Sequence, residues 1–266
     1  MNTNTNINIC KNCNETFQDT YCHHCGEKIV EDEDFSIRTI LQQTFDGFTN
    51  IDSKFLRSFK YLLFKPGRLT EAFVEGIRKP FMKPIQLFLI INVMFFFFLP
   101  NSDILRIPSK WYFNVEHRAK DLKEMSVKNG ISEQELMQSY DAKSLTYSKA
   151  AVIIIIPFEA LLFALINFRK GYQFGKHAIF ATHYFSFFLL FCITLRFVPF
   201  VDGNSKVIQT AIIGINFLYL FFGIKTFYKD SFLISGIKAS IAVVGCISLA
   251  LLYRDLISDF SLLFIK

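Results

Sequence analysis

The sequence lacks the short motifs that mark many enzyme active sites. It has no GxSxG nucleophile elbow, no HExxH zinc-protease motif and no carboxylate-pair motif. A secretory signal peptide is not expected either, because the first nine residues, MNTNTNINI, are polar and uncharged. No repeat of the hydrophobic segments is visible, which argues against the repeat folds of secondary transporters. An enzyme is therefore the weakest of the function classes considered below.

Charge is also missing from long parts of the chain. The sequence is 52% hydrophobic with 33 Phe, and its mean hydropathy is +0.31. Several runs of about 18 residues or more are nearly free of charge, which is the length that an α-helix needs to cross a bilayer. We predict a mainly α-helical integral membrane bundle in contact with lipid. The net charge of +6 lies in loops and membrane flanks, so no nucleic-acid partner is expected.

Two CxxC pairs, CKNC and CHHC, stand near the N-terminus with eight residues between them. A CxxC turn lets two thiolates reach one metal ion, and Gly26 after the second pair gives the backbone the freedom such a turn needs. Four sulfurs close a tetrahedral shell and leave no position for a substrate, so we predict a structural zinc ribbon. The predicted ligands are Cys10, Cys13, Cys22 and Cys25.

Two other interpretations of the cysteines are less favoured. A thioredoxin-like redox motif needs one CxxC in a βαβ context, and a disulfide staple needs an oxidising compartment. His23 and His24 lie inside the second pair and could replace a cysteine, but they are interpreted as exposed turn residues. The segment is too short for an apolar core, so we expect it to need metal to fold.

We predict three parts: the ribbon over 1–30, cytoplasmic amphipathic helices over 31–80 and a transmembrane domain over 81–266. The middle part is expected to hold the helices FSIRTILQQTFDGF, SKFLRSFKYLLF and EAFVEGI. Asp52 or Ser53 is expected to cap the second of these, and Thr70 the third. Such basic helices suit an anionic inner leaflet, but they could equally pack on the protein's own spans.

The transmembrane domain is expected to contain five spans, at about 81–99, 150–168, 178–200, 207–224 and 232–252. Lys and Arg gather before the first span, between spans two and three, and between spans four and five. The loop between spans three and four has only Lys206, opposed by Asp202. Positive-inside logic therefore predicts a multi-pass inner-membrane protein with a cytoplasmic N-terminus.

The long loop over 100–149 is expected outside the membrane, because its charges are nearly balanced and lie far from the span ends. It should be helical. One helix is expected to end at Gly130, and Ser132 with Glu135 predicts a capping box for the next.

Three ionisable residues fall in the inner part of the predicted spans: Glu159, His183 and Lys238. A lone charge there costs about 2.5–3.5 kcal/mol on insertion scales, so we predict that the three form one polar cluster. The cluster could be structural, a ligand or ion site, or an acid–base site. If Lys238 instead reaches the cytoplasmic face, Glu159 needs another partner, such as His183, Asn92 or Asn216.

Small residues in the spans have simpler interpretations. Cys192 and Cys246 are interpreted as small buried hydrophobic residues. Ser235, Ala239 and Ala242 give the last span a small-residue face for close helix packing.

The order of these features resembles a known family. A start of the form CxNC…YCxxCG is followed by amphipathic helices and by the phrase LLFKPGRLTEAFVEGIRKPFMKPIQLFLIINVMFFFF. The chain resembles the bacterial multi-span membrane proteins that carry domain of unknown function 3667, chiefly through PGR…GIRKPF…P over 66–84. A later phrase, HAIFATHYFSFFLLF over 177–191, resembles the family's third-span pattern. The resemblance implies a zinc-ribbon membrane protein and no particular activity.

Three functions follow from these features. The favoured one is a non-enzymatic membrane protein whose cytoplasmic ribbon binds a protein partner or supports assembly. The first alternative is a small transporter or channel subunit that uses the Glu159, His183 and Lys238 cluster. The second is a membrane enzyme with His183 and Glu159 as acid–base groups.

Overall fold

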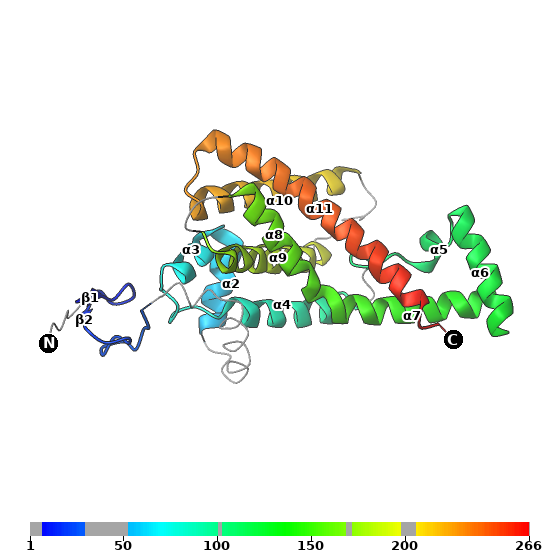
Figure 1. Cartoon of the computed structure of the whole chain (residues 1–266), viewed down its shortest axis with the longest axis horizontal. Coiled ribbons are helices and arrows are strands. Elements are labelled where there is room, and N and C mark those ends of the chain that lie inside the picture. Colours follow the sequence, from blue (N-terminus) through cyan, green and yellow to red (C-terminus); the bar gives the residue numbers. More distant parts are fainter. Residues whose placement is uncertain (1–6, 30–52, 101–102, 169–171, 198–205, 266) are drawn as a thin grey trace.

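The computed structural model describes residues 7–29, 53–100, 103–168, 172–197 and 206–265 (Figure 1). A small two-stranded ribbon precedes a mainly helical body. The elements in chain order are β1 (Asn8–Ile9), β2 (Thr16–Phe17), α2 (Lys54–Phe64), α3 (Arg68–Val74), α4 (Pro84–Phe98), α5 (Ser109–Tyr112), α6 (Glu116–Asn129), α7 (Glu133–Ala151), η2 (Val152–Ile154), α8 (Ile155–Ile166), α9 (Phe174–Arg196), α10 (Lys206–Phe227) and α11 (Phe232–Leu262).

Four helical stretches among the described residues are long and apolar enough to cross a membrane. They are Glu133–Ile166, Phe174–Arg196, Thr210–Phe227 and Phe232–Leu262. They confirm the predicted fold class of a helical membrane bundle. Helix α4 stands where the first span was predicted but has 15 residues. At 1.5 Å per residue it reaches about 22 Å, less than the ~30 Å of the hydrocarbon core. The fifth span therefore stays a prediction.

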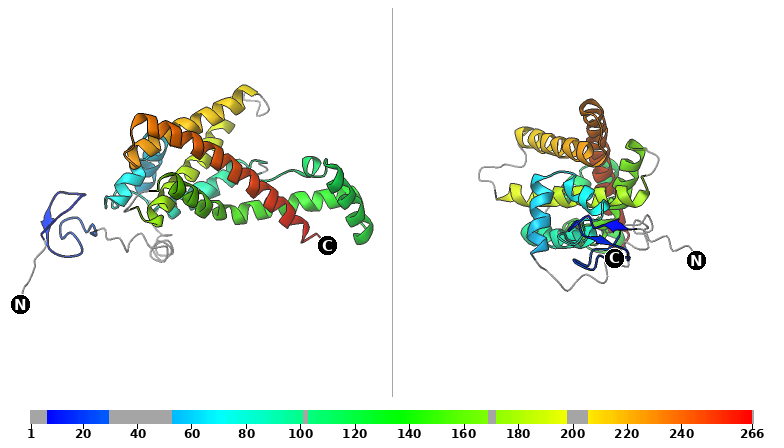
Figure 2. Two further views of the ribbon diagram at one scale, coloured as in Figure 1. Left: turned by 45° about the horizontal axis from the view of Figure 1, so that its top comes forward. Right: turned by 90° about the vertical axis from the view of Figure 1, so that its left-hand side faces the viewer.

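The helices are arranged between two ends of an elongated body (Figures 1 and 2). The ribbon end carries the ribbon, α2, α3, the starts of α4, α9 and α11, and the last residues of α8 and α10. The far end carries α5, α6, the first part of α7 and the last part of α11. Helices α8, α9, α10 and α11 therefore alternate in direction, as successive membrane spans must.

Helix α9 is the centre of the main hydrophobic core. It packs against α8, α4, α3 and α2, and 72% of its 18-residue apolar stretch is buried inside the protein. Phe163 of α8 and Phe180 of α9 meet edge to face at 4.9 Å. Because α9 is surrounded by protein, its polar side chains face other helices rather than lipid, so each needs a partner within the bundle.

A second, smaller core lies at the far end, where Tyr112, Phe113, Leu122, Leu136, Tyr140 and Ile265 pack together. Asp141 holds this core to the preceding loop. It accepts hydrogen bonds from the backbone N–H and the hydroxyl of Ser109, and it pairs with Arg106 at 2.6 Å. The far end is therefore a packed group of helices with its own hydrophobic core, called the far-end layer below.

Two local predictions for this layer are confirmed. Gly130 ends α6 in the left-handed conformation with φ 65°. Ser132 and Glu135 form the predicted capping box at the start of α7, with both reciprocal hydrogen bonds present.

The predictions for the amphipathic helices of residues 31–80 have different outcomes. The first of them, FSIRTILQQTFDGF, and the possible cap Asp52 lie outside the described residues. Ser53 is the N-cap residue of α2 but makes no capping hydrogen bond through its side chain. The prediction that Thr70 caps α3 is wrong, because α3 begins at Arg68 after Gly67 and Thr70 lies inside it.

Candidate functional site

The ribbon is built from two copies of the same turn, twelve residues apart. CKNCNE over 10–15 corresponds to CHHCGE over 22–27. In each copy the first cysteine's N–H donates to the carbonyl of the glutamate, at 2.8 Å in both. The residue after the second cysteine has a positive φ in each, 61° for Asn14 and 70° for Gly26. Antiparallel pairing flanks both turns, between Ile9 and Thr16 and between Tyr21 and Lys28.

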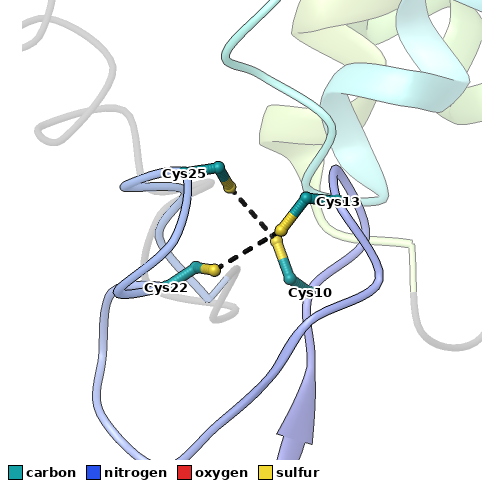
Figure 3. A group of neighbouring side chains, drawn as sticks. All are labelled: Cys10, Cys13, Cys22 and Cys25. Carbon is teal, nitrogen blue, oxygen red and sulfur yellow. Dashed lines mark hydrogen bonds between the residues drawn. The ribbon is translucent and has the colours of Figure 1, made fainter.

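The two turns bring four sulfur atoms together (Figure 3). All four Sγ atoms lie within 4.8 Å of one another, with 3.5 Å between Cys10 and Cys25 and 3.6 Å between Cys13 and Cys22. A tetrahedral site with metal–sulfur bonds of about 2.3 Å has sulfur–sulfur edges of about 3.8 Å. The four cysteines could therefore hold one metal ion after shifts of no more than about 1 Å.

The pKa values of the thiols show that the four cysteines do not all ionise readily without a cation. Asn12 donates to the Cys25 sulfur and, with the backbone N–H of Glu27, lowers the pKa of Cys25 to about 6. The backbone N–H of Glu15 acts to lower the pKa of Cys13, but burial and the neighbouring thiols outweigh it and raise that pKa to about 12. Four thiolates cannot crowd together uncompensated, and a divalent cation supplies that compensation.

One residue of the second turn docks the ribbon on the body. The Glu27 side chain is buried and accepts hydrogen bonds from the backbone N–H groups of Arg78 (3.2 Å) and Lys79 (2.8 Å). A buried carboxylate is tolerated only when it is hydrogen-bonded. Arg78 in turn donates through Nε to the Phe73 carbonyl and stacks over the Phe73 ring at 4.9 Å. The ribbon is thus fixed to the loop between α3 and α4.

The PGR turn that precedes α3 has its own structural reason. Gly67 has φ 78°, which L residues rarely adopt. A Cβ there would lie 2.6 Å from the Gly223 carbonyl oxygen of α10 and 3.0 Å from Thr226 Cβ. Glycine is required both for the backbone conformation and for the close approach of the α2–α3 turn to α10.

Helix α3 also reaches the core of the bundle. The Thr70 hydroxyl and His183 Nδ1 of α9 lie 2.8 Å apart, and both residues are buried. The nearby His177 Nδ1 lies 2.8 Å from the Tyr228 hydroxyl. The Nδ1 atom of each histidine therefore has a partner, whereas His183 Nε2 is buried without a hydrogen-bond partner among the described residues. The Ser186 hydroxyl donates back to the Thr182 carbonyl of its own helix, which gives no support for a nucleophile.

The predicted polar cluster is divided among different partners. Lys238 Nζ donates to Asp230 Oδ2 at 2.7 Å and to Asn167 Oδ1 at 3.0 Å, both at the ribbon end. Glu159, His183 and Lys238 make no hydrogen bond or ion pair with one another in the described structure. The pairing of Lys238 with Glu159 is thus replaced by an ion pair with Asp230. The physical reason is that the lysine side chain is long enough to carry its ammonium group to the ribbon end of the bundle.

Glu159 lies instead beside polar residues of the other three long helices. Tyr184 of α9, Asn216 of α10 and Cys246 of α11 line the same cavity as Glu159 of α8. The Tyr184 hydroxyl donates to Asn216 Oδ1 at 3.2 Å. The Oε2 atom of Glu159 is buried and has no hydrogen-bond partner in the described structure. The cavity has a volume of about 150 Å³ and is otherwise mainly apolar.

Several of these contacts were missed by the analysis of the sequence. Cys246 is buried as predicted, and it also lines the cavity beside Glu159. Glu27 and Asp230 were not considered, although the twelve-residue repeat of CxxCxE marks Glu27 as part of the turn. The small-residue face of α11 is confirmed as buried, since Ser235, Ala239 and Ala242 are all 0% exposed.

The comparison with protein families gives one match. The family described as "Protein of unknown function (DUF3667)" matches residues 52–96. This segment contains α2, α3, most of α4, the PGR turn against α10 and the loop on which Glu27 docks. Comparisons with curated proteins and with solved structures found no match. The resemblance that residues 66–84 predicted is thereby confirmed, because they lie within residues 52–96, which match this family of unknown function and are called the family segment below.

Proposed function

We propose that this chain is a non-enzymatic zinc-ribbon protein of the inner membrane, in which the ribbon serves as an assembly module on the cytoplasmic side. The observation that carries the proposal is the pair of hydrogen bonds from Arg78 and Lys79 to Glu27. Zinc bound by the four cysteines orders the second turn, and that turn presents Glu27 to the loop of the family segment. Zinc is thereby linked to the shape of the membrane domain's ribbon end.

The donor set supports zinc over other ions. Thiolate ligands in a tetrahedral arrangement select zinc or iron, whereas calcium and magnesium prefer oxygen. The site has no open position, which suits a structural ion. Over residues 7–29 the buried hydrophobic core consists of Phe17, Cys10 and Cys22, so a metal ion is the ribbon's main source of folding free energy.

The orientation follows from charge and redox chemistry. Lys65, Arg68, Arg78, Lys79 and Lys83 precede α4 at the ribbon end. Cytoplasmic flanks carry such an excess, and thiolates stay reduced in the cytoplasm. In this proposal the docked ribbon also offers the surface on which a cytoplasmic protein partner assembles.

Metal analysis of the purified full chain tests the proposal. We expect about one zinc per chain by the four-thiolate stoichiometry. The double change Cys13→Ser and Cys25→Ser should remove it, whereas Cys192→Ala, which changes a buried cysteine of α9, should keep it. Full zinc retention in the double variant, or iron in place of zinc in the native chain, would refute the assignment.

A second candidate function is a small transporter or channel subunit, and one observation favours it. A buried carboxylate oxygen of Glu159 without a partner, beside a cavity, is costly unless an ion, a proton or a ligand uses it. The test is proton flux in liposomes with a pH-sensitive dye. Glu159→Gln should abolish a flux that Glu133→Gln, at the exposed start of α7, leaves intact. A native protein with no flux above empty liposomes excludes this candidate.

A further inference from the structure

We propose that the ribbon and the family segment together form a binding site for a phosphate group at the ribbon end. The inference rests on the proposed function, because the site exists only when the ribbon is docked through Glu27. The phosphate belongs either to a phospholipid headgroup or to a free anion, and the experiment below separates these two sources.

The site is a cleft of about 440 Å³ between the second cysteine turn and the helical body. Three separate parts of the chain contribute to its walls: the ribbon, the first residue of α2, and the stretch from the end of α3 to the start of α4. Its charged lining residues are Glu27, Lys28, Lys54, Arg78, Lys79 and Lys83. No single helix terminus makes this cleft, because the ribbon supplies Cys25, Glu27 and Lys28 to its lining.

The charge of the cleft is strongly one-sided. Five of its lining residues are lysines or an arginine, and Glu27 is its one carboxylate. A zinc ion with four thiolates carries two further negative charges, and Cys25 lies on the wall. With both counted, the formal charge of the lining residues is +2, and three of the cations, Lys28, Arg78 and Lys83, also interact with other groups. The other two, Lys54 and Lys79, supply the charge that matches a phosphate monoester dianion, or a phosphodiester with one charge to spare.

The fixed parts of the cleft hold these cations in place. Glu27 accepts hydrogen bonds from the backbone N–H groups of Arg78 and Lys79. The backbone from which these two basic side chains project is therefore held in a defined position. The Lys79 ammonium lies 3.8 Å from the position that a Cβ on Gly26 would occupy, which places it over the second cysteine turn. The Lys54 and Lys79 side chains have no ion pair with any other residue that the structure describes.

Phosphate suits this arrangement better than a planar carboxylate. Its oxygens point in several directions and accept charge-assisted hydrogen bonds from Lys and Arg on different sides. The apolar wall of Phe73, Phe81 and Met82 suits the carbon stem that a headgroup carries. Gln86 is the third residue of α4, so the cleft lies at the depth where a predicted membrane span begins.

The test uses the full, zinc-loaded chain and two probes. Inorganic phosphate is titrated by calorimetry into the protein in phosphatidylcholine nanodiscs. Short-chain phosphatidic acid is added to the protein in detergent and counted by native mass spectrometry, with zwitterionic phosphatidylcholine as the comparison of zero net charge. Zinc content is measured on every sample.

The variant Lys54→Gln with Lys79→Gln should weaken binding by about tenfold to thirtyfold at low salt, since each lysine near a charged surface contributes modestly. The matched control, Lys110→Gln with Lys120→Gln, removes the same charge from the far end and should bind as the native chain does. Lys54→Gln alone, at the exposed start of α2, serves if the double variant loses zinc.

Binding of phosphatidic acid but not inorganic phosphate assigns the site to a lipid headgroup, and equal binding of both assigns it to the free anion. A zinc-loaded native chain that binds neither probe overturns this inference and leaves the proposed function standing. Equal loss in the control variant also overturns it. A native chain without zinc overturns the proposed function and, with it, this site.

Discussion

Gly67 offers the sharpest stability prediction, because the structure assigns it two separate constraints. Its φ of 78° costs an alanine about 1–2 kcal/mol, since the Cβ crowds the following carbonyl in the left-handed region. The added Cβ also lies 2.6 Å from the Gly223 carbonyl oxygen, which is backbone and cannot rotate away. Overpacking of this kind costs about 1–3 kcal/mol. Gly67→Ala should therefore lower the free energy of unfolding by about 2–5 kcal/mol.

The chain contains a matched control. Gly130 has φ 65°, nearly the same conformation, but a Cβ there meets nothing within 4 Å. Gly130→Ala should lower the free energy of unfolding by only the backbone part, about 1–2 kcal/mol. The difference between the two variants isolates the close approach of the α2–α3 turn to α10.

Unfolding in mixed detergent micelles, followed by helical circular dichroism, measures both variants. The reasoning is refuted if Gly67→Ala is no more destabilising than Gly130→Ala. In that case the PGR turn does not approach α10 as the structure has it, and the glycine would serve the turn conformation alone.

The remaining predictions concern the ion pair of Lys238 with Asp230 at the ribbon end and the membrane topology. Lys238→Met and Asp230→Asn should each cost about 3–5 kcal/mol of unfolding free energy while the double change costs less than their sum, because a single change leaves the other charge without the opposite charge beside it. The changes in unfolding free energy from Glu159→Gln and Lys238→Met should add to within about 0.5 kcal/mol in the double variant. A larger deviation would mean that Glu159 and Lys238 interact, contrary to the structure. A membrane-impermeant maleimide should label Val127→Cys from outside intact cells and Ser53→Cys only after permeabilisation. The reverse pattern would invert the proposed orientation.

Local features of this fold are predictable from short stretches of sequence. The cysteine spacing predicted four converging thiols, and the order Gly130, Ser132, Glu135 predicted the α6–α7 junction. Each depends on residues no more than fifteen positions apart, so a short stretch of chain carries all the groups involved. The repeat CKNCNE and CHHCGE was also visible in the sequence and would have identified Glu27.

Contacts between distant helices could not be predicted in the same way. Thr70 and His183 are 113 positions apart, and their hydrogen bond depends on the rotation of both helices. Lys238 was compared only with other residues inside the spans, whereas its partner Asp230 precedes α11. Hydropathy places a residue at a depth in the bilayer but does not say which neighbour it faces, so depth alone suggested a cluster that the packing divides.

The most direct test of the central claim, that zinc orders the ribbon and the ribbon fixes the family segment, is hydrogen exchange at two amides. In the zinc-loaded chain the N–H groups of Arg78 and Lys79 donate to Glu27 and should be protected. Both Glu27→Gln and the Cys13→Ser, Cys25→Ser double variant should speed exchange at these two amides, while the Leu136 amide in α7 exchanges as before. Unchanged protection of Arg78 and Lys79 in the zinc-free variant would contradict the account.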